Sequence, residues 1–225
     1  MKPKTIYKIA IDFFLTVGLL LLMAYELIGE ATHEWIGVSM LLLCIMHHIL
    51  NWNWISHLPK VKYTAYNILQ TIVTAFVFLS VVGLMISGMI LSRHVFDFLT
   101  ISDGQSSLAR ILHMLCAYWG FVLMSVHMGL HLNILMSFTR KVLHISKPSV
   151  PRAIFLCTIG LLIAAYGIYA FFQRQIGSYL FLQNEFVFFD FNEPLIAFFA
   201  DYLAIMGLFV CIGYYVSKLL RLQGQ

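Results

Sequence analysis

Residues 112–131 have the sequence LHMLCAYWGFVLMSVHMGLH. The stretch contains no Lys, Arg, Asp or Glu, and about twenty consecutive apolar residues are enough for a helix to span a bilayer. Three histidines nevertheless lie inside it, at His113, His127 and His131. Ionisable residues inside a membrane are costly and usually mark a functional path. The stretch therefore predicts a membrane-spanning helix that carries a functional site.

The composition of the whole chain also indicates a membrane protein. Of its 225 residues, 61% are hydrophobic and only 11% are charged, and the mean hydropathy is +0.87. A soluble domain of average composition has about 25% charged residues, so the composition excludes a soluble enzyme. It also excludes a disordered chain, which needs low hydrophobicity, and a disulfide scaffold, which needs more than the four cysteines present.

Apolar segments of sufficient length occur six times along the chain. They lie near Ile9–Ile28, Trp35–Trp54, Tyr66–Ile90, Leu108–Met136, Ile154–Phe172 and Leu195–Leu219. The first follows three lysines, as a signal peptide would, but its apolar run is too long and no small-residue cleavage site follows it. We therefore predict an all-α integral membrane protein with six transmembrane helices.

The basic residues are distributed unevenly between the two sides of such a protein. Eleven of the 14 Lys and Arg residues fall on the side that holds both termini: Lys2, Lys4, Lys8, Lys60, Lys62, Arg140, Lys141, Lys147, Arg152, Lys218 and Arg221. Cytoplasmic loops carry an excess of Lys and Arg, so we predict a multi-pass protein in the lipid of the cytoplasmic membrane, with both termini cytoplasmic. These residues are scattered through short loops and form no basic face, so we expect no nucleic-acid partner.

Six of the nine histidines lie on the second and fourth predicted spans. His33 and His47 are 14 residues apart, and so are His113 and His127. In a left-handed bundle with about 3.5 residues per turn, this spacing is four whole turns, so each pair lies on one face with its members about 21 Å apart along the axis. The two helices are separated by a single span and run in the same direction. His33 and His113 should then lie near the outer surface, and His47 and His127 toward the cytoplasm.

Two facing imidazoles at one depth are the axial ligands of a six-coordinate haem, whose porphyrin supplies the other four nitrogens. We predict two haem b groups, an outer one held by His33 and His113 and an inner one held by His47 and His127. A zinc site is less consistent with this pattern, because zinc needs about four ligands close together. Covalent c-type haem is excluded, because the chain has no Cys-x-x-Cys-His motif.

Two further histidines leave the choice of inner ligands open. His48 follows His47 directly and is an alternative to it. His131 lies one turn beyond His127, and it could replace His127 as a ligand or hydrogen-bond a haem propionate or a quinone. A quinone is therefore a further candidate cofactor. The three remaining histidines are predicted to be solvated loop residues: His57, His94 and His144.

These motifs resemble a known family. The chain has HEWIG at residues 33–37, MHHILNWNW at 46–54, LHM at 112–114 and VHMGLH at 126–131. In these segments it resembles the flavinylation-associated cytochrome domain, one of the four-helix, two-haem membrane b-type cytochromes, over roughly residues 8–138. The resemblance implies a transmembrane electron conduit that serves an extracytoplasmic flavoprotein, often one with covalently bound FMN. The matching family positions are His33, His47, His113 and His127, with His131 as an additional motif residue.

The linker near residues 137–152 contains two of the five prolines and predicts a division of the chain. Residues 1–140 would form a four-helix, di-haem cytochrome b-like bundle. Residues 141–225 would add two transmembrane helices and an aromatic-rich outer loop, which is predicted to lie in the membrane interface or to contact a partner.

We therefore predict a b-type cytochrome that conducts electrons between the cytoplasmic or quinone side and an extracytoplasmic, flavin-carrying redox partner. It would be the electron-transfer component of an oxidoreductase system, with haem doing the redox chemistry. No catalytic side chains are predicted, because the loops contain no nucleotide-binding glycine pattern and no nucleophile–base arrangement. One alternative is a quinol-oxidising or ferric-reducing enzyme that uses the same haems. The other is a proton or metal transporter lined by the histidines.

Overall fold

Long helices dominate the computed structural model, which describes residues 3–60, 63–98, 103–145, 147–184, 186–190 and 192–223. Six of them are long and apolar enough to cross a membrane, and no strand occurs within these ranges. The prediction of an all-α chain with six candidate spans is therefore confirmed. The six helices are α1 (Pro3–Met23), α3 (Glu30–Leu50), α5 (Ala65–Leu91), α6 (Asp103–Val142), α7 (Val150–Gln173) and α9 (Leu195–Gln223).

Short helices occupy several of the connections, and two long helices end earlier than their apolar segments suggest. The short elements are α2 (Tyr25–Ile28), α4 (Trp52–His57), the 3₁₀ turn η1 (Leu58–Lys60) and α8 (Ile176–Leu180). Gly29 lies between α2 and α3 with φ +81°, a conformation that glycine adopts without a steric penalty. Helix α3 ends before Asn51, whose backbone leaves the helical region at φ −100° and ψ 10° and whose side-chain amide donates to the His47 carbonyl at 2.9 Å.

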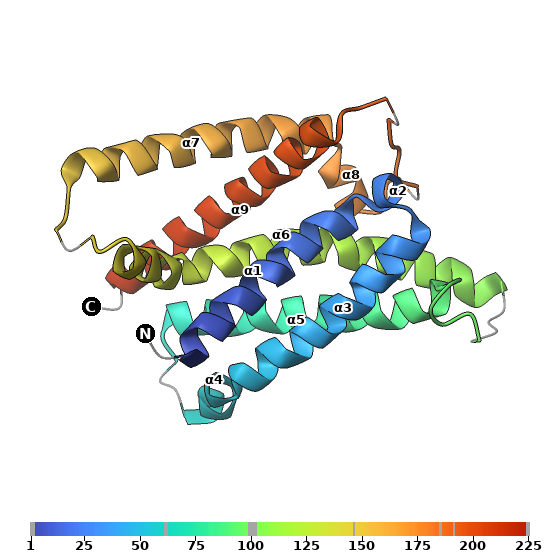
Figure 1. Ribbon diagram of the computed structural model, residues 1–225, viewed down its shortest axis with the longest axis horizontal. Coiled ribbons are helices and arrows are strands. Elements are labelled where there is room, and N and C mark those ends of the chain that lie inside the picture. The colour runs from blue at the N-terminus through green and yellow to red at the C-terminus, as the bar shows by residue number, and fades with distance from the viewer. Residues whose placement is uncertain are drawn as a thin grey trace.

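The six long helices run along the length of the molecule, and both termini lie at the same end (Figure 1). We call this the inner end; α4 and the connection from α6 to α7 lie there too, whereas α2 and α8 lie at the opposite, outer end (Figure 1). The common position of the termini agrees with an even number of crossings. That the inner end faces the cytoplasm stays a prediction, and two of the basic residues behind it, Lys2 and Lys62, are outside the described residues.

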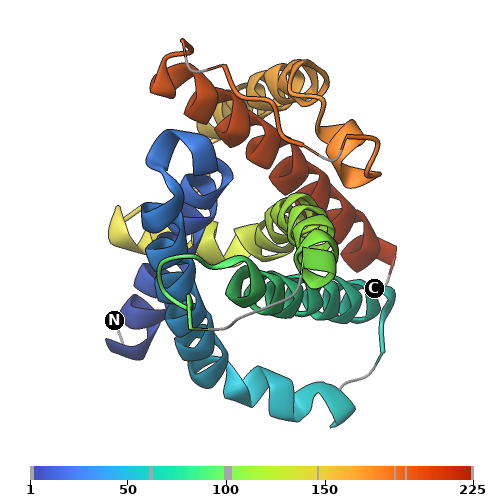
Figure 2. The same ribbon diagram turned by 90° about the vertical axis from the view of Figure 1, so that its right-hand side faces the viewer.

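The helices pack in two groups. Helices α5, α6, α9 and α7 follow one another in space, each packed against the next, while α1 and α3 pair beside them (Figure 2). Helices α6 and α9 approach so closely that a Cβ on Gly129 would lie 2.3 Å from the Val210 carbonyl oxygen, and one on Gly213 would lie 2.4 Å from that of Val126. Whether residues 1–140 form a separate bundle stays a prediction, but α9, from the second predicted part, packs directly on α6.

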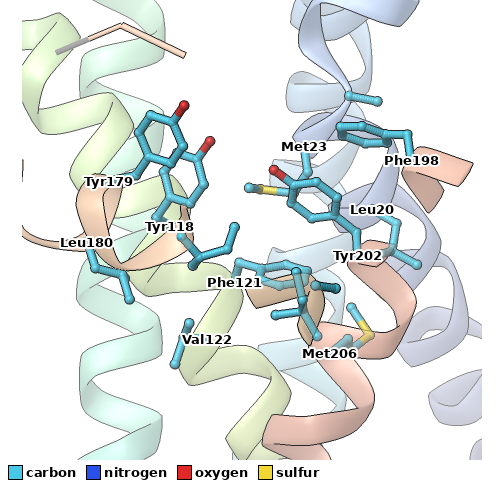
Figure 3. Packing of buried hydrophobic residues seen from close by; sticks show 14 of the residues in the cluster. Leu20, Met23, Tyr118, Phe121, Val122, Tyr179, Leu180, Phe198, Tyr202 and Met206 are labelled. Carbon is cyan, nitrogen blue, oxygen red and sulfur yellow. The ribbon is translucent and has the colours of Figure 1, made fainter. Parts of the chain in front are cut away.

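The largest buried cluster lies toward the outer half of this contact. It joins α6, α8 and α9 to the end of α1, which contributes Leu20 and Met23, and Figure 3 shows these side chains converging. Tyr118 and Tyr179 stack with ring centroids 4.6 Å apart, and Phe198 is 2% exposed. The buried apolar area here stabilises the α6–α9 half of the molecule. By contrast, none of the residues of α3, all of which the structure describes, is buried.

A charged network lies at the outer end of α7 and α9. Arg174 donates to Glu193 at 2.7 Å and to Asp201 at 2.8 Å, and the Glu193 carboxylate raises the pKa of the guanidinium. Tyr166 donates to the second oxygen of Asp201, and the guanidinium lies 5.3 Å from the centre of the Phe198 ring. Charged groups within membrane spans usually pair with one another. The network therefore accounts for an acid, Asp201, inside the last apolar helix.

Candidate functional site

The outer predicted pair, His33 and His113, comes together although α3 and α6 touch little elsewhere. The two ring centroids are 6.1 Å apart, with an angle of 62° between the ring planes. Tyr25 of α2 packs edge-on against His33 at 5.0 Å. Burial, with help from the Glu30 and Glu26 carboxylates, raises the pKa of Tyr25, so its hydroxyl remains a proton donor beside this pair.

The ring nitrogens of the outer pair differ in their partners. His113 Nδ1 lies 3.0 Å from Ser87 Oγ, and Ser87 donates its own proton to the Gly83 carbonyl at 2.6 Å. The serine oxygen therefore accepts from Nδ1–H, which directs the free lone pair of His113 to Nε2. His33 Nδ1 is buried and has no hydrogen-bond partner. Buried polar atoms without a partner are rare in folded proteins, and a bound group at this level would account for this one.

The two sides of the outer pair differ in their packing. A Cβ added to Gly37, one turn along α3, would meet nothing within 4 Å. On the opposite side, a Cβ on Gly88 of α5 would lie 3.5 Å from His113 Cε1, an ordinary contact distance. Helix α3 is therefore open one turn beyond His33, whereas His113 is packed against α5.

The spacing of the outer pair can be compared with that of two imidazoles on one metal ion. Metal–imidazole bonds of about 2.0–2.1 Å on opposite sides of an ion place the ring centres about 6 Å apart. The observed 6.1 Å between His33 and His113 matches this value. With the unpaired Nδ1 of His33 and the open space at Gly37, these residues fit the ligand set of a six-coordinate haem.

The inner histidines also gather in one region. The rings of His127 and His131 are 4.8 Å apart, and those of His47 and His48 are 5.6 Å apart. His127 lies within electrostatic range of the other three. The structure therefore places the α3 and α6 histidines in the same region at the inner level, and it does not by itself choose between His47 and His48.

The two α6 histidines of the predicted pairs have matching partners on α5. Thr74 Oγ1 lies 3.3 Å from Nδ1 of His127, as Ser87 Oγ lies near Nδ1 of His113. Metal-ligating histidines almost always hydrogen-bond through the second ring nitrogen, which orients the ring. His131 differs, because its Nε2 lies 3.3 Å from the amide nitrogen of Gln70. This contact gives His131 a hydrogen-bonding partner on α5, but Nε2 of His47 has a comparable neighbour, the side-chain amide nitrogen of Asn51 at 3.4 Å. The choice of His127 over His131 as a ligand therefore stays a prediction.

The α3 side of the inner group includes a residue that the sequence reasoning missed. Asp12 of α1 accepts a hydrogen bond from His47 Nδ1 at 2.7 Å. His48 instead places its Nδ1 2.8 Å from the Cys44 carbonyl in its own helix. An acid near the start of the apolar segment 9–28 was the available signal, but its partner lies 35 residues away and cannot be identified from local sequence.

Glu34 connects α3 to the segment that follows α5, beside the outer pair. Its Oε2 accepts hydrogen bonds from Ser92 Oγ at 2.6 Å and from the backbone N–H groups of His94 and Val95 at 3.0 and 2.9 Å. Its Oε1 accepts from the backbone N–H of Arg93 at 2.8 Å. One carboxylate thus satisfies three consecutive backbone donors of the outer connection.

Glu34 also belongs to a cluster that could in principle hold a cation. Ligand atoms of Glu30, Glu34 and His94 lie within 4.8 Å of one another. However, the oxygens of Glu34 are already engaged by the outer connection, and Arg93 Nε lies 3.6 Å from Glu30. These contacts account for the cluster without a metal ion, so we assign none to it.

Replacing Glu34 with Gln should loosen the outer connection. The amide would offer only one acceptor oxygen and would place an N–H₂ group against backbone donors. Hydrogen bonds to a charged group contribute about 1.5–3 kcal/mol, so amide hydrogen exchange at Arg93, His94 and Val95 should accelerate about tenfold or more. The control is Glu26→Gln on the exposed surface of α2, which should leave this exchange unchanged. Equal exchange in the Glu34→Gln variant and the unmodified protein would contradict the anchoring role.

The fold is that of a helical protein with six helices long and apolar enough to cross a membrane, and it brings His33 and His113 together. No protein-family model matches the chain, and neither a curated protein nor a solved structure matches it. The resemblance to the flavinylation-associated cytochrome family therefore stays a prediction, and the function rests on the geometry of the site.

Proposed function

We propose that the chain is a transmembrane b-type cytochrome that conducts electrons between the cytoplasmic or quinone side and an extracytoplasmic redox partner. Two haems would be held by histidine pairs, His33 with His113 and His47 with His127. The observation that supports this proposal is the outer pair, whose rings lie 6.1 Å apart and in which the buried Nδ1 of His33 has no hydrogen-bond partner, so that these two residues would hold a haem. A flavin-carrying partner is proposed from the sequence resemblance alone.

The protein's contribution is to hold and orient the ligands at two depths. Haem, when bound, supplies the one-electron redox chemistry. Helix α6 runs unbroken from Asp103 to Val142, so it carries both of its ligand histidines on one rigid element. The 14-residue spacing separates them by about 21 Å along the axis. Ser87 and Thr74 hydrogen-bond the Nδ1 atoms, which orients each α6 imidazole toward the space next to α3.

Haem counting on the purified protein is the direct test. A reduced-minus-oxidised spectrum and a pyridine haemochrome assay should show two haem b per chain after expression with an adequate haem supply. A protein with no Soret absorption under those conditions would contradict the proposal and favour the proton or metal transporter. Metal analysis of the same sample would then distinguish those two activities.

A quinol-oxidising enzyme is the second candidate, and one inner feature favours it. Gln70 is 8% exposed, and its side-chain amide contacts His131. A buried amide beside a histidine is the kind of polar group that fixes the orientation of a small molecule in its site. If a quinone-site inhibitor blocks reduction of the haems by a soluble quinol analogue, the enzyme assignment is preferred over a simple conduit.

A further inference from the structure

An acidic side chain within the first apolar helix contacts the inner histidine group. Asp12 lies in the candidate span Lys4–Met23, and its side chain is 52% exposed on a surface that a membrane would cover. Ionisable side chains at such positions are costly and usually functional. The Asp12 carboxylate accepts a hydrogen bond from Nδ1 of His47 at 2.7 Å. This hydrogen bond offsets part of the cost of placing an acid in an apolar helix.

Asp12 makes the ligand environments of the two proposed haems unequal. At the outer level, His113 donates to a neutral hydroxyl, that of Ser87, and His33 hydrogen-bonds the backbone of Leu22 while its Nδ1 has no partner. At the inner level, the partner of His127 is again a neutral hydroxyl, that of Thr74. Among these four described ligand positions, His47 is the one whose Nδ1 contacts a carboxylate.

The chemical consequence follows from ligand basicity. A carboxylate that accepts a hydrogen bond from an imidazole makes the opposite nitrogen a stronger electron donor. A stronger donor, with a negative charge nearby, favours the more positively charged, oxidised form of the iron. The inner site should therefore be harder to reduce than the outer one.

Other charged groups also lie near the two pairs. At the inner end, the Lys8 ammonium is directed to Asn51 Oδ1 at 2.7 Å, and Arg221 lies over the Tyr66 ring at 4.2 Å. At the outer end, Glu34 lies within electrostatic range of His33, but its oxygens accept from the backbone of the outer connection. Asp12 is thus the carboxylate with a short hydrogen bond to a proposed ligand.

We propose that Asp12 is a positioning residue that gives the inner site the lower reduction potential, so that electrons enter at the inner end and leave at the outer end. This inference rests on the proposed function. The electron donor would be a membrane quinol, which loses two electrons and two protons at the inner side. The acceptor would be an oxidised flavin of the outer partner, which takes up those electrons one at a time.

The test is a spectroelectrochemical titration of the haem-loaded protein. Two midpoint potentials are expected, and His127→Ala should remove the lower one. Asp12→Asn should make reduction of the inner site about tenfold more favourable, which for a one-electron couple is a rise of 59 mV, and should leave the outer midpoint in place. Asp12→Glu keeps the charge and should preserve the lower midpoint. Ser87→Ala is the matched control at the outer level and should move the outer midpoint alone.

A second neutral variant, Asp12→Ser, provides the same measurement if the Asp12→Asn protein does not retain haem. It should raise the inner midpoint potential in the same way. The inference is wrong if a neutral variant with both haems leaves the inner midpoint unmoved, or shifts both midpoints equally. It is also wrong if His127→Ala removes the higher midpoint, or if Asp12→Glu behaves like Asp12→Asn. Absence of haem from the unmodified protein would instead refute the proposed function, and the role of Asp12 with it.

Discussion

Replacement of His33 or His113 by alanine is expected to remove one and the same haem and to leave the other in place. The reason is the direct juxtaposition of the two rings, 6.1 Å apart, on helices that otherwise touch little. Loss of either axial ligand breaks the six-coordinate site, while the inner histidines lie about 21 Å away along the helix axis. The haem-to-protein ratio should fall from two to one in both variants, and the remaining reduced-minus-oxidised spectrum should be identical.

His94→Ala is the matched control, because His94 lies in the outer connection and contacts Glu34 at 3.4 Å rather than the outer pair. It should retain both haems. If His33→Ala and His113→Ala leave different residual spectra, the two residues bind different haems and the pairing is wrong. The same assay on His47→Ala, His48→Ala, His127→Ala and His131→Ala would identify the inner ligands.

Gly213→Ala is expected to disrupt the contact between α6 and α9. The added Cβ would lie 2.4 Å from the Val126 carbonyl oxygen and 3.2 Å from the Gly129 Cα. These are backbone atoms, so the helices themselves must move apart. Overpacking a core typically costs 1–3 kcal/mol and occasionally more, and we expect about 3 kcal/mol or more here. A large fall in the midpoint of thermal unfolding in detergent and a loss of monodisperse protein should follow.

Gly160→Ala provides the control for this substitution. A Cβ at Gly160 of α7 would have its nearest contact at 3.9 Å, with Cys211 Sγ. Both substitutions gain the same helix propensity, about 1 kcal/mol for Gly to Ala, so their difference reports the steric contact. Equal unfolding midpoints for the two variants would show that α6 and α9 do not cross at Gly213.

The number of spans could be predicted because each one depends on a single segment. About twenty apolar residues satisfy the length of the bilayer core whatever their neighbours are. The ends of the helices were harder to predict. The second apolar segment continues to Trp54, but α3 ends at Leu50, where the backbone of Asn51 leaves the helical region. That local change of backbone conformation does not follow from hydrophobicity.

The pairing of His33 with His113 could be anticipated from helix periodicity and direction, since both histidines lie near the outer ends of parallel helices. The hydrogen-bonding partners of the histidines could not be anticipated in this way. Asp12, Thr74 and Ser87 are isolated polar residues in apolar segments, and polar side chains at such positions often bond their own helix. Their roles depend on which helix lies beside which, and that is decided by the packing of side chains from distant segments.

By itself, therefore, the sequence determined the membrane class, the six helices and the two levels at which histidines occur, because length, composition and periodicity act within one helix. The tertiary structure decided that α9 packs against α6 through Gly129 and Gly213, and that Asp12 contacts His47. Both contacts join residues far apart in the chain. They form only where steric fit and hydrogen bonding select one arrangement of helices whose apolar surfaces would otherwise be interchangeable.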